Sequence, residues 1–385
     1  MSNEIDQAQF SKCVALRKAL HQEPETAFEE TQTAQKVLDF LEETKPDRLE
    51  KNIGGYGILA FYQGKRKGKT LLFRSELDAL PIAESNTFEH RSKIKGKAHK
   101  CGHDGHMSIL AALALMLEDR EFPGTVILLF QPAEETGEGA LAMMKDKRWK
   151  KLDLKVDQAY ALHNLPGYDL HQVILRKDVF AAASKGMIVK LNGKPSHAAH
   201  PMNGINPSLA IAQIVQSFYE IPQMFTPIEQ TALITPIGMK AGQKAFGTSA
   251  SEGEIYATIR TYENHQMEKL GELLEERVQN LCKAHRLNCE IEWVESFPAV
   301  ENSNSAVELT AKACDELGFD SIWKDTPFSW SEDFGQFAQV FPSCMFGLGS
   351  GKESPQLHNE DYDFPDELIK TAAPLFYKLI QLENE

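Results

Sequence analysis

The segment that most constrains this chain is residues 99–106, where three histidines, one cysteine and one aspartate stand within eight positions. Imidazole, thiolate and carboxylate groups are together the donors of transition-metal sites. Similar polar side chains recur far away in the sequence, at residues 131–135, 162–164 and 357–359. The chain must therefore fold so that distant loops meet, and the pattern predicts a hydrolytic metal centre with two ions.

Apolar runs that precede these segments predict a buried sheet. Residues 125–130 are apolar apart from Thr125, which is typical of a central strand, and residues 160–162 lead into His163 in the same way. Helical patterns alternate with such strands, for example at residues 29–43. This order predicts an α/β domain with helices on both faces of a mixed sheet, in which functional residues follow the carboxyl ends of the strands.

Four local expectations can be checked against the structure. Strands at residues 57–62 and 70–74 are joined by a basic, glycine-containing turn, which predicts a β-hairpin. Asp104 is expected to cap a helix that extends to about residue 118. His163 is expected just beyond the end of its strand, and a helix is expected at residues 332–340.

The middle of the chain predicts a second domain. Its elements follow the order β-α-β-β-α-β, from a strand at residues 186–191 to a strand at residues 289–294, which is the split βαβ pattern of ferredoxin-like domains. We expect a catalytic, metal-binding domain made of residues 1–184 and 296–385. Residues 185–295 would form an inserted lid or dimerisation domain.

Composition disfavours several classes of partner. The chain has 385 residues, too many for one ordinary core of about 100–200 residues, so two domains are expected. Its formal net charge of −14 disfavours nucleic acid and anionic membranes. No targeting segment is recognised, and no apolar run approaches the roughly 20 residues that span a bilayer, so we expect a cytoplasmic protein. The six cysteines are scattered and are expected to be reduced thiols.

Two pairs of residues carry the chemical argument. Cys101 and His103 are two positions apart, so in an extended or looped backbone both side chains can reach one site. Glu134 and Glu135 directly follow an apolar strand and point to opposite sides of an extended chain, so one can bind metal and the other can hold a nucleophilic water. Each pair taken alone is more often an ordinary loop feature. Their joint occurrence favours the metal interpretation.

Six motifs give the chain a resemblance to a known family. They are residues 74–81, 99–106, 131–135, 162–164, 331–334 and 357–359. In this order, and over nearly the whole chain, they resemble the M20 metallopeptidase/amidohydrolase family and within it the N-acyl-amino-acid amidohydrolases. That branch includes hippurate hydrolases, auxin–amino-acid conjugate hydrolases and N-acetyl-diaminopimelate deacetylases.

The resemblance implies a role for each motif residue. The implied ligands of two divalent metal ions per subunit are Cys101, His103, Glu135, His163 and His358, with the Cys101 thiolate able to bridge the ions. Glu134 is the implied general base, and Asp78 is the implied residue that orients a metal-bound histidine. Glu76 stands where other branches have a metal-binding histidine and is not counted as a ligand. The ligand types favour zinc or manganese, and nickel or cobalt would also fit.

The inserted domain corresponds to the lid of the family. His197 matches the lid histidine that reaches the substrate, where it could donate a hydrogen bond to the oxyanion, and His200 is an alternative partner. Residues 246–251 stand where family lids often carry an asparagine-containing stretch, so an unusual acyl or amino-acid pocket is expected. By the same analogy, we expect two chains to form a homodimer through the lid.

The implied reaction is hydrolysis of the amide bond of small N-acyl amino acids or related conjugates by a metal-activated water. Two alternatives remain open from the sequence. The first is an aminopeptidase or dipeptidase that uses the same centre on small peptides, and the second is an inactive, metal-containing binding homologue. A redox-sensing thiol protein built around Cys101 ranks last, because no resolving cysteine lies nearby in the sequence.

Overall fold

The computed structural model describes residues 5–228 and 230–385, which divide into two compact units. The first unit comprises the chain up to Phe180 together with Val300–Thr326 and Asp333–Glu385. The second unit comprises Ala181–Ala299 and Pro327–Glu332. Among the helices of the described residues, none is long and apolar enough to cross a membrane.

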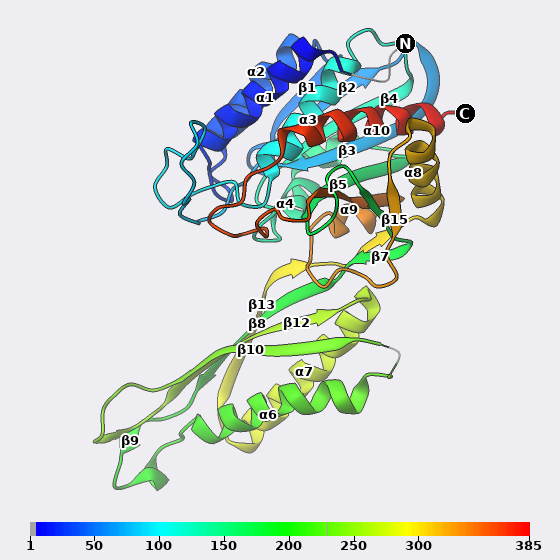
Figure 1. Cartoon of the computed structure of the whole chain (residues 1–385). Coiled ribbons are helices and arrows are strands. Elements are labelled where there is room, and N and C mark those ends of the chain that lie inside the picture. Colours follow the sequence, from blue (N-terminus) through cyan, green and yellow to red (C-terminus); the bar gives the residue numbers. More distant parts are fainter. Residues whose placement is uncertain (1–4, 229) are drawn as a thin grey trace. The chain divides into compact units, whose positions relative to one another are not determined.

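An eight-stranded mixed sheet forms the centre of the first unit, in the order β1-β2-β4-β3-β5-β16-β6-β15 (Figure 1). Its strands are β1 Arg48–Ile53, β2 Gly57–Gln63, β3 Arg66–Glu76, β4 Pro123–Gln131, β5 Gln158–Pro166, β6 Val173–Leu175, β15 Ser321–Trp323 and β16 Ser343–Gly351. Strands β4, β3, β5 and β16 are neighbours and run parallel, whereas β1 and β2 add antiparallel pairings at one edge. The predicted α/β fold with a mixed sheet is confirmed.

Helices cover both faces of this sheet. They are α1 Gln7–Gln22, α2 Thr31–Glu43, α3 His103–Met116, α4 Gly139–Lys145, α5 Lys147–Leu152, α8 Asn304–Leu317, α9 Gly335–Ala338 and α10 Ile369–Leu382, with a short 3₁₀ turn at Asp366–Leu368. Alternate strand residues such as Leu71 and Phe73 pack with α1, α2, α3, α8 and α10 in one core cluster. The intervening Leu72 points to the opposite face, where α4 contacts β4 and α9 contacts β16.

The predicted hairpin between residues 57–62 and 70–74 is wrong, because β4 lies between β2 and β3. Strand β4 is antiparallel to β2 and parallel to β3. A strand that is buried along its length needs a hydrogen-bonding neighbour on each side. The turn after β2 binds the segment that enters β4 instead of closing a hairpin: the Gly64 N–H donates to the Gly124 carbonyl over 2.8 Å.

Two of the other local predictions also need correction. Asp104 does not cap α3: the N-cap is Gly102, whose φ of 95° lies in the left-handed region. A Cβ at Gly102 would lie 2.6 Å from Asn164 Oδ1, so only glycine fits there. The helix expected at residues 332–340 is reduced to α9. Asp333, near the expected start of that helix, takes part in a buried polar network.

That network joins the ends of β3 and β4 to the segment before α9. The Arg74 guanidinium donates to Gln131 Oε1 over 2.9 Å and to Asp333 Oδ1 over 2.7 Å, and it also pairs with Glu76. Gln131 Nε2 donates to both Asp333 oxygens over 2.7 and 2.8 Å. These charges have almost no solvent exposure, so they are stable only as mutual partners.

The second unit is a four-stranded antiparallel sheet with two helices. Its elements are β8 Ala183–Asn192, α6 Ser208–Phe225, β10 Ala232–Ala241, β12 Glu252–Thr261, α7 Asn264–Ala284 and β13 Asn288–Phe297. The sheet order β10-β12-β8-β13 and the chain order together are those of a ferredoxin-like split βαβ domain, as predicted. Alternate strand residues such as Val189 and Ile255 pack against α6 and α7 in one cluster.

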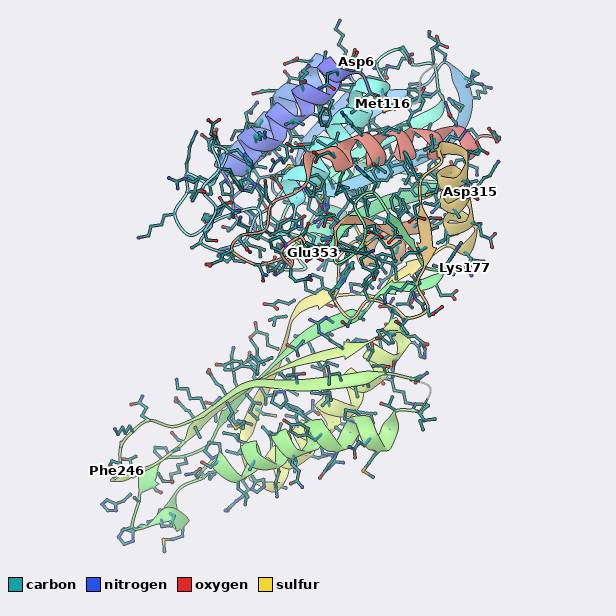
Figure 2. All side chains as sticks on the ribbon, viewed as in Figure 1. Asp6, Met116, Lys177, Phe246, Asp315 and Glu353 are labelled. Carbon is teal, nitrogen blue, oxygen red and sulfur yellow. The ribbon has the colours of Figure 1, made fainter. Side chains whose placement is uncertain are left out.

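Small elements complete the structure. In the second unit, β9 Ser196–His197 pairs with β11 Thr248–Ser249, and Pro201–Asn203 forms a 3₁₀ turn. Phe246 is 92% exposed, and Figure 2 labels it beside this pair. Strands β7 Asp178–Ala181 and β14 Val300–Asn302 form a separate two-stranded sheet.

Candidate metal centre

The parallel strands bring the predicted site residues to one edge of the sheet. Asp78 lies two residues after β3, and Glu134 lies three residues after β4. His163 lies inside β5 rather than beyond its end, which corrects the expected position by a few residues. Cys101 precedes α3, and His358 lies in the loop between β16 and α10. Residues from five segments of the chain thus meet at the carboxyl ends of the central strands.

All five predicted ligands belong to two close groups of donor atoms. Cys101, His103 and His163 each place one donor within 4.8 Å of the others, and so do Cys101, Glu135 and His358. Cys101 therefore belongs to both groups. A third group combines His103, Glu135 and Glu134.

The separations between donors suit metal ions. Cys101 Sγ lies 3.4 Å from His163 Nε2, His103 Nε2 lies 3.8 Å from Glu135 Oε1, and His358 Nε2 lies 3.7 Å from Glu135 Oε2. Tetrahedral donors at about 2.1–2.3 Å from a zinc ion stand about 3.4–3.8 Å apart. His103 Nε2 is buried and has no hydrogen-bond partner among the described residues. The residues present therefore fit a thiolate-, imidazole- and carboxylate-bound divalent ion.

Hydrogen bonds orient two of the histidines. His103 Nδ1 donates to the Asp78 backbone carbonyl over 2.8 Å, and His163 Nδ1 donates to the Asn164 carbonyl over 2.9 Å. Each contact assigns the proton to Nδ1 and directs the Nε2 lone pair towards the donor groups. The Asp78 carboxylate also accepts the Glu135 N–H over 2.9 Å. Asp78 thus touches the segments that carry two predicted ligands.

The electrostatics of the two histidines differ. Burial, with a contribution from His106, lowers the pKa of His163 to about 3, so its ring is neutral at pH 7, as a metal ligand must be. Burial by itself also lowers the pKa of His103, but the hydrogen bond to Asp78 and the charges of Glu76 and Glu135 outweigh burial and raise that pKa to about 10. The surroundings of His103 therefore carry excess negative charge, which favours a cation at this point.

The other histidines of residues 99–106 lie outside the two groups that share Cys101. His106 Nδ1 contacts Glu76 Oε2 and its Nε2 contacts Asn164 Oδ1, both over 2.6 Å. Glu76, His103 and His106 also lie close together, but the contact between Glu76 and His106 already occupies both. His99 is buried, and burial lowers its pKa to about 3.

His197 lies in the second unit. It stands in β9, where its backbone pairs with Thr248, and its Nδ1 accepts the Ala199 N–H over 3.0 Å. The rings of His197 and His200 are 5.8 Å apart. Its contact with substrate remains a prediction.

Sequence reasoning missed a buried group of charges next to the donors, here called the ionic cluster: Arg17, His21, Glu84, Lys100 and Asp104. His21 lies between two carboxylates, with Nδ1 at 2.8 Å from Asp104 Oδ2 and Nε2 at 2.9 Å from Glu84 Oε1. Arg17 contacts Asp104, and Lys100 contacts Glu84. The only sequence signal is the spacing of Arg17 and His21, which places both on one face of α1.

Comparison with known proteins establishes the family. Peptidase family M20/M25/M40 matches residues 72–382. The chain therefore belongs to this family, and it is a metal-dependent amidohydrolase of the M20 type, as predicted.

Relatives match over almost their whole length. N-acetylcysteine deacetylase of Bacillus subtilis is 25% identical over 376 residues, 97% of each chain. Hippurate hydrolase of Campylobacter jejuni is 28% identical over 379 residues, 97% of this chain and 96% of the other. A solved structure from methicillin-resistant Staphylococcus aureus has a TM-score of 0.89 at 25% identity, with 98% of both chains covered.

A Bacillus subtilis protein described as a dinuclear metal binding peptidase from M20 family has a TM-score of 0.82 at 23% identity, again over 98% of both chains. At this identity the likeness shows the fold.

We predict that replacing Cys101 lowers the affinity for both ions, because Cys101 belongs to both donor groups. Cys101→Ala should weaken metal binding by more than roughly 10–100-fold. That range is the cost of losing a residue that only hydrogen-bonds to a metal ligand. Elemental analysis after dialysis against metal-free buffer measures this effect. Cys289→Ala, at a partly exposed cysteine of the second unit, is the matched control. Unchanged metal content in Cys101→Ala would exclude Cys101 as a ligand.

The ionic cluster predicts a pH-dependent stability. Burial alone lowers the pKa of His21, but the charge of Asp104 and hydrogen bonds to Asp104 and Glu84 raise it to about 9. Protonated His21 therefore stabilises the fold fully below about pH 6.5, and this contribution is lost as pH rises through about 9.

Urea unfolding measured from pH 6 to 9.5 should show that the difference in unfolding free energy between wild type and His21→Gln shrinks between about pH 6.5 and about pH 9, by about 1.4 kcal/mol per pH unit. A difference that stays constant with pH would contradict the assigned charge of His21.

Proposed function

We propose that this chain hydrolyses the amide bond of small N-acyl amino acids, with water as nucleophile and Glu134 as general base. The observation that carries the proposal is the pair of donor groups that share Cys101, with a further buried acid, Glu134, beside them. The names of two relatives, N-acetylcysteine deacetylase and hippurate hydrolase, support an N-acyl amino acid as the substrate class.

The proposed ligands of two divalent ions are Cys101, His103, Glu135, His163 and His358. The mixture of thiolate, imidazole and carboxylate favours zinc or manganese, and nickel or cobalt also fits. When bound at such a site, divalent ions lower the pKa of a water molecule and polarise a carbonyl group.

Two observations support Glu134 as the group that moves the proton. Its Oε2 lies 3.7 Å from His103 Nε2, and its side chain is only 7% exposed. We assign to Glu134 the removal of a proton from the attacking water and its delivery to the leaving amine. Asp78 supports this geometry, because its carbonyl orients His103 and its carboxylate holds the backbone of Glu135.

The second unit has the proposed role of the lid. We assign His197, on β9, a hydrogen bond to the oxyanion of the reacting carbonyl. The unusual residues 246–251, which include the exposed Phe246, have the proposed role of shaping acyl or amino-acid preference.

The cytoplasmic location stays a prediction.

Activity assays separate the proposed hydrolase from two alternatives: an aminopeptidase or dipeptidase with the same centre, and an inactive binding homologue. We would test a panel of N-acyl amino acids and dipeptides after chelation and re-addition of zinc, manganese, cobalt or nickel. Metal-dependent release of amino acid from the acylated substrates supports the proposal. Turnover of dipeptides alone, or no turnover by metal-loaded protein, would refute it.

Replacing the proposed base should separate chemistry from metal binding. Glu134→Gln should lower kcat by roughly 10²–10⁴-fold, because the amide cannot accept the proton of the water. Elemental analysis should find wild-type metal content in this variant. Glu138→Gln, an exposed glutamate of the same loop, is the control and should keep wild-type kcat. Full turnover by Glu134→Gln would refute the assignment.

We also predict a homodimer through the second unit. Three large apolar residues of the edge strand β10 are exposed: Leu233 by 53%, Ile237 by 65% and Met239 by 55%. An exposed apolar edge strand is suited to pairing with a second copy. Light scattering should give twice the chain mass of 43.1 kDa for wild type, and the mass of one chain for Ile237→Lys. A monomeric wild type would contradict the prediction.

A further inference from the structure

Lys100 is a fully buried lysine beside a proposed metal ligand. Lysine is seldom buried unless its ammonium group has partners. Here Nζ donates to Glu84 Oε1 over 2.5 Å, to Asn86 Oδ1 over 3.0 Å and to the Tyr362 carbonyl over 2.7 Å. The three contacts use all three ammonium donors.

Tyr362 lies in the loop between β16 and α10, and the backbone of Lys100 makes a second connection to this loop. Its carbonyl accepts the His358 N–H over 2.8 Å. Lys100 therefore holds the loop at two points, His358 through its backbone and Tyr362 through its side chain. His358 has a φ of 66°, a left-handed conformation that a residue with a side chain adopts only when its surroundings impose it.

A neighbouring loop reinforces this attachment. The Ser85 N–H donates to the Glu360 carbonyl over 3.0 Å, and Asn86 Nδ2 donates to the Asp361 carbonyl over 2.9 Å. Glu84 is held in turn by His21. The loop that carries His358 is thus fixed by polar contacts from Ser85, Asn86 and Lys100. Of these three residues, Lys100 is the one adjacent to Cys101 in the sequence.

The other donor group is oriented differently. The rings of His103 and His163 are set by the carbonyls of Asp78 and Asn164, and neither contact involves Lys100. Loss of the Lys100 ammonium should therefore disturb the group of Cys101, Glu135 and His358 more than the group of Cys101, His103 and His163.

We propose that Lys100 is a positioning residue that sets the place of His358, and so the affinity of one of the two ion sites, without touching the ion itself. This rests on the proposed two-ion function.

The test is a cobalt titration of the full chain after removal of metal by a chelator, followed by calorimetry and by the sulfur-to-cobalt absorption band. Wild type should bind two ions per chain. Lys100→Met should keep the affinity for one ion within about threefold and weaken the other by about 10–100-fold, as outer partners of ligands do. Lys97→Met is the control and should match wild type, because Lys97 is a partly exposed lysine three residues earlier in the same loop and pairs with Glu29 rather than with the loop of His358.

Thermal unfolding of each variant separates positioning from a general loss of stability. If Lys100→Met does not fold, the double variant Lys100→Gln/Glu84→Gln replaces it, because this pair leaves no single buried charge behind. The same selective loss of one ion is expected.

Equal weakening of both ions, or no weakening, would overturn the role of Lys100 and leave the two-ion centre standing. A wild type that binds fewer than two ions would overturn the two-ion centre and the role of Lys100 together.

Discussion

The convergence of acidic and neutral donors around Cys101 is the constraint on which the rest of the first unit depends. Burying a thiol, imidazoles and carboxylates at separations of 3.4–3.8 Å costs free energy unless a cation or hydrogen bonds compensate. The rise in the pKa of His103 records the local excess of negative charge. Parallel strands β3, β4, β5 and β16 make the convergence feasible, since their carboxyl ends meet at one edge.

Two buried polar networks hold this edge in place. The Arg74 network ties the ends of β3 and β4 to Asp333, in the segment before α9. The ionic cluster ties α1 to the loop that carries Cys101 through Asp104 and Lys100. Both are built of charges that are stable only as partners, so each ligand loop is fixed by groups that would be costly to separate.

Sequence reasoning found the elements of both units because apolar periodicity is a local signal, clear in the buried strand β4 and in the βαββαβ order of the second unit. It also selected the residues that the structure gathers into donor groups, because their motifs occur together. It failed where long-range contacts decide. The hairpin expected from β2 and β3 does not form, because β4 lies between them. Asp104 contacts His21 instead of capping α3. Nothing in the local sequence marks Lys100 as a link to Tyr362 and His358.

The central claim is that one thiolate serves two ions. X-ray absorption spectroscopy of zinc-loaded protein, at a measured two ions per chain, tests it most directly. The account predicts an average of one sulfur neighbour per zinc at about 2.3 Å, although Cys101 is the one cysteine in the donor groups of the described residues. An average of half a sulfur per zinc would mean that Cys101 binds one ion alone, and no sulfur neighbour would contradict the proposed centre altogether.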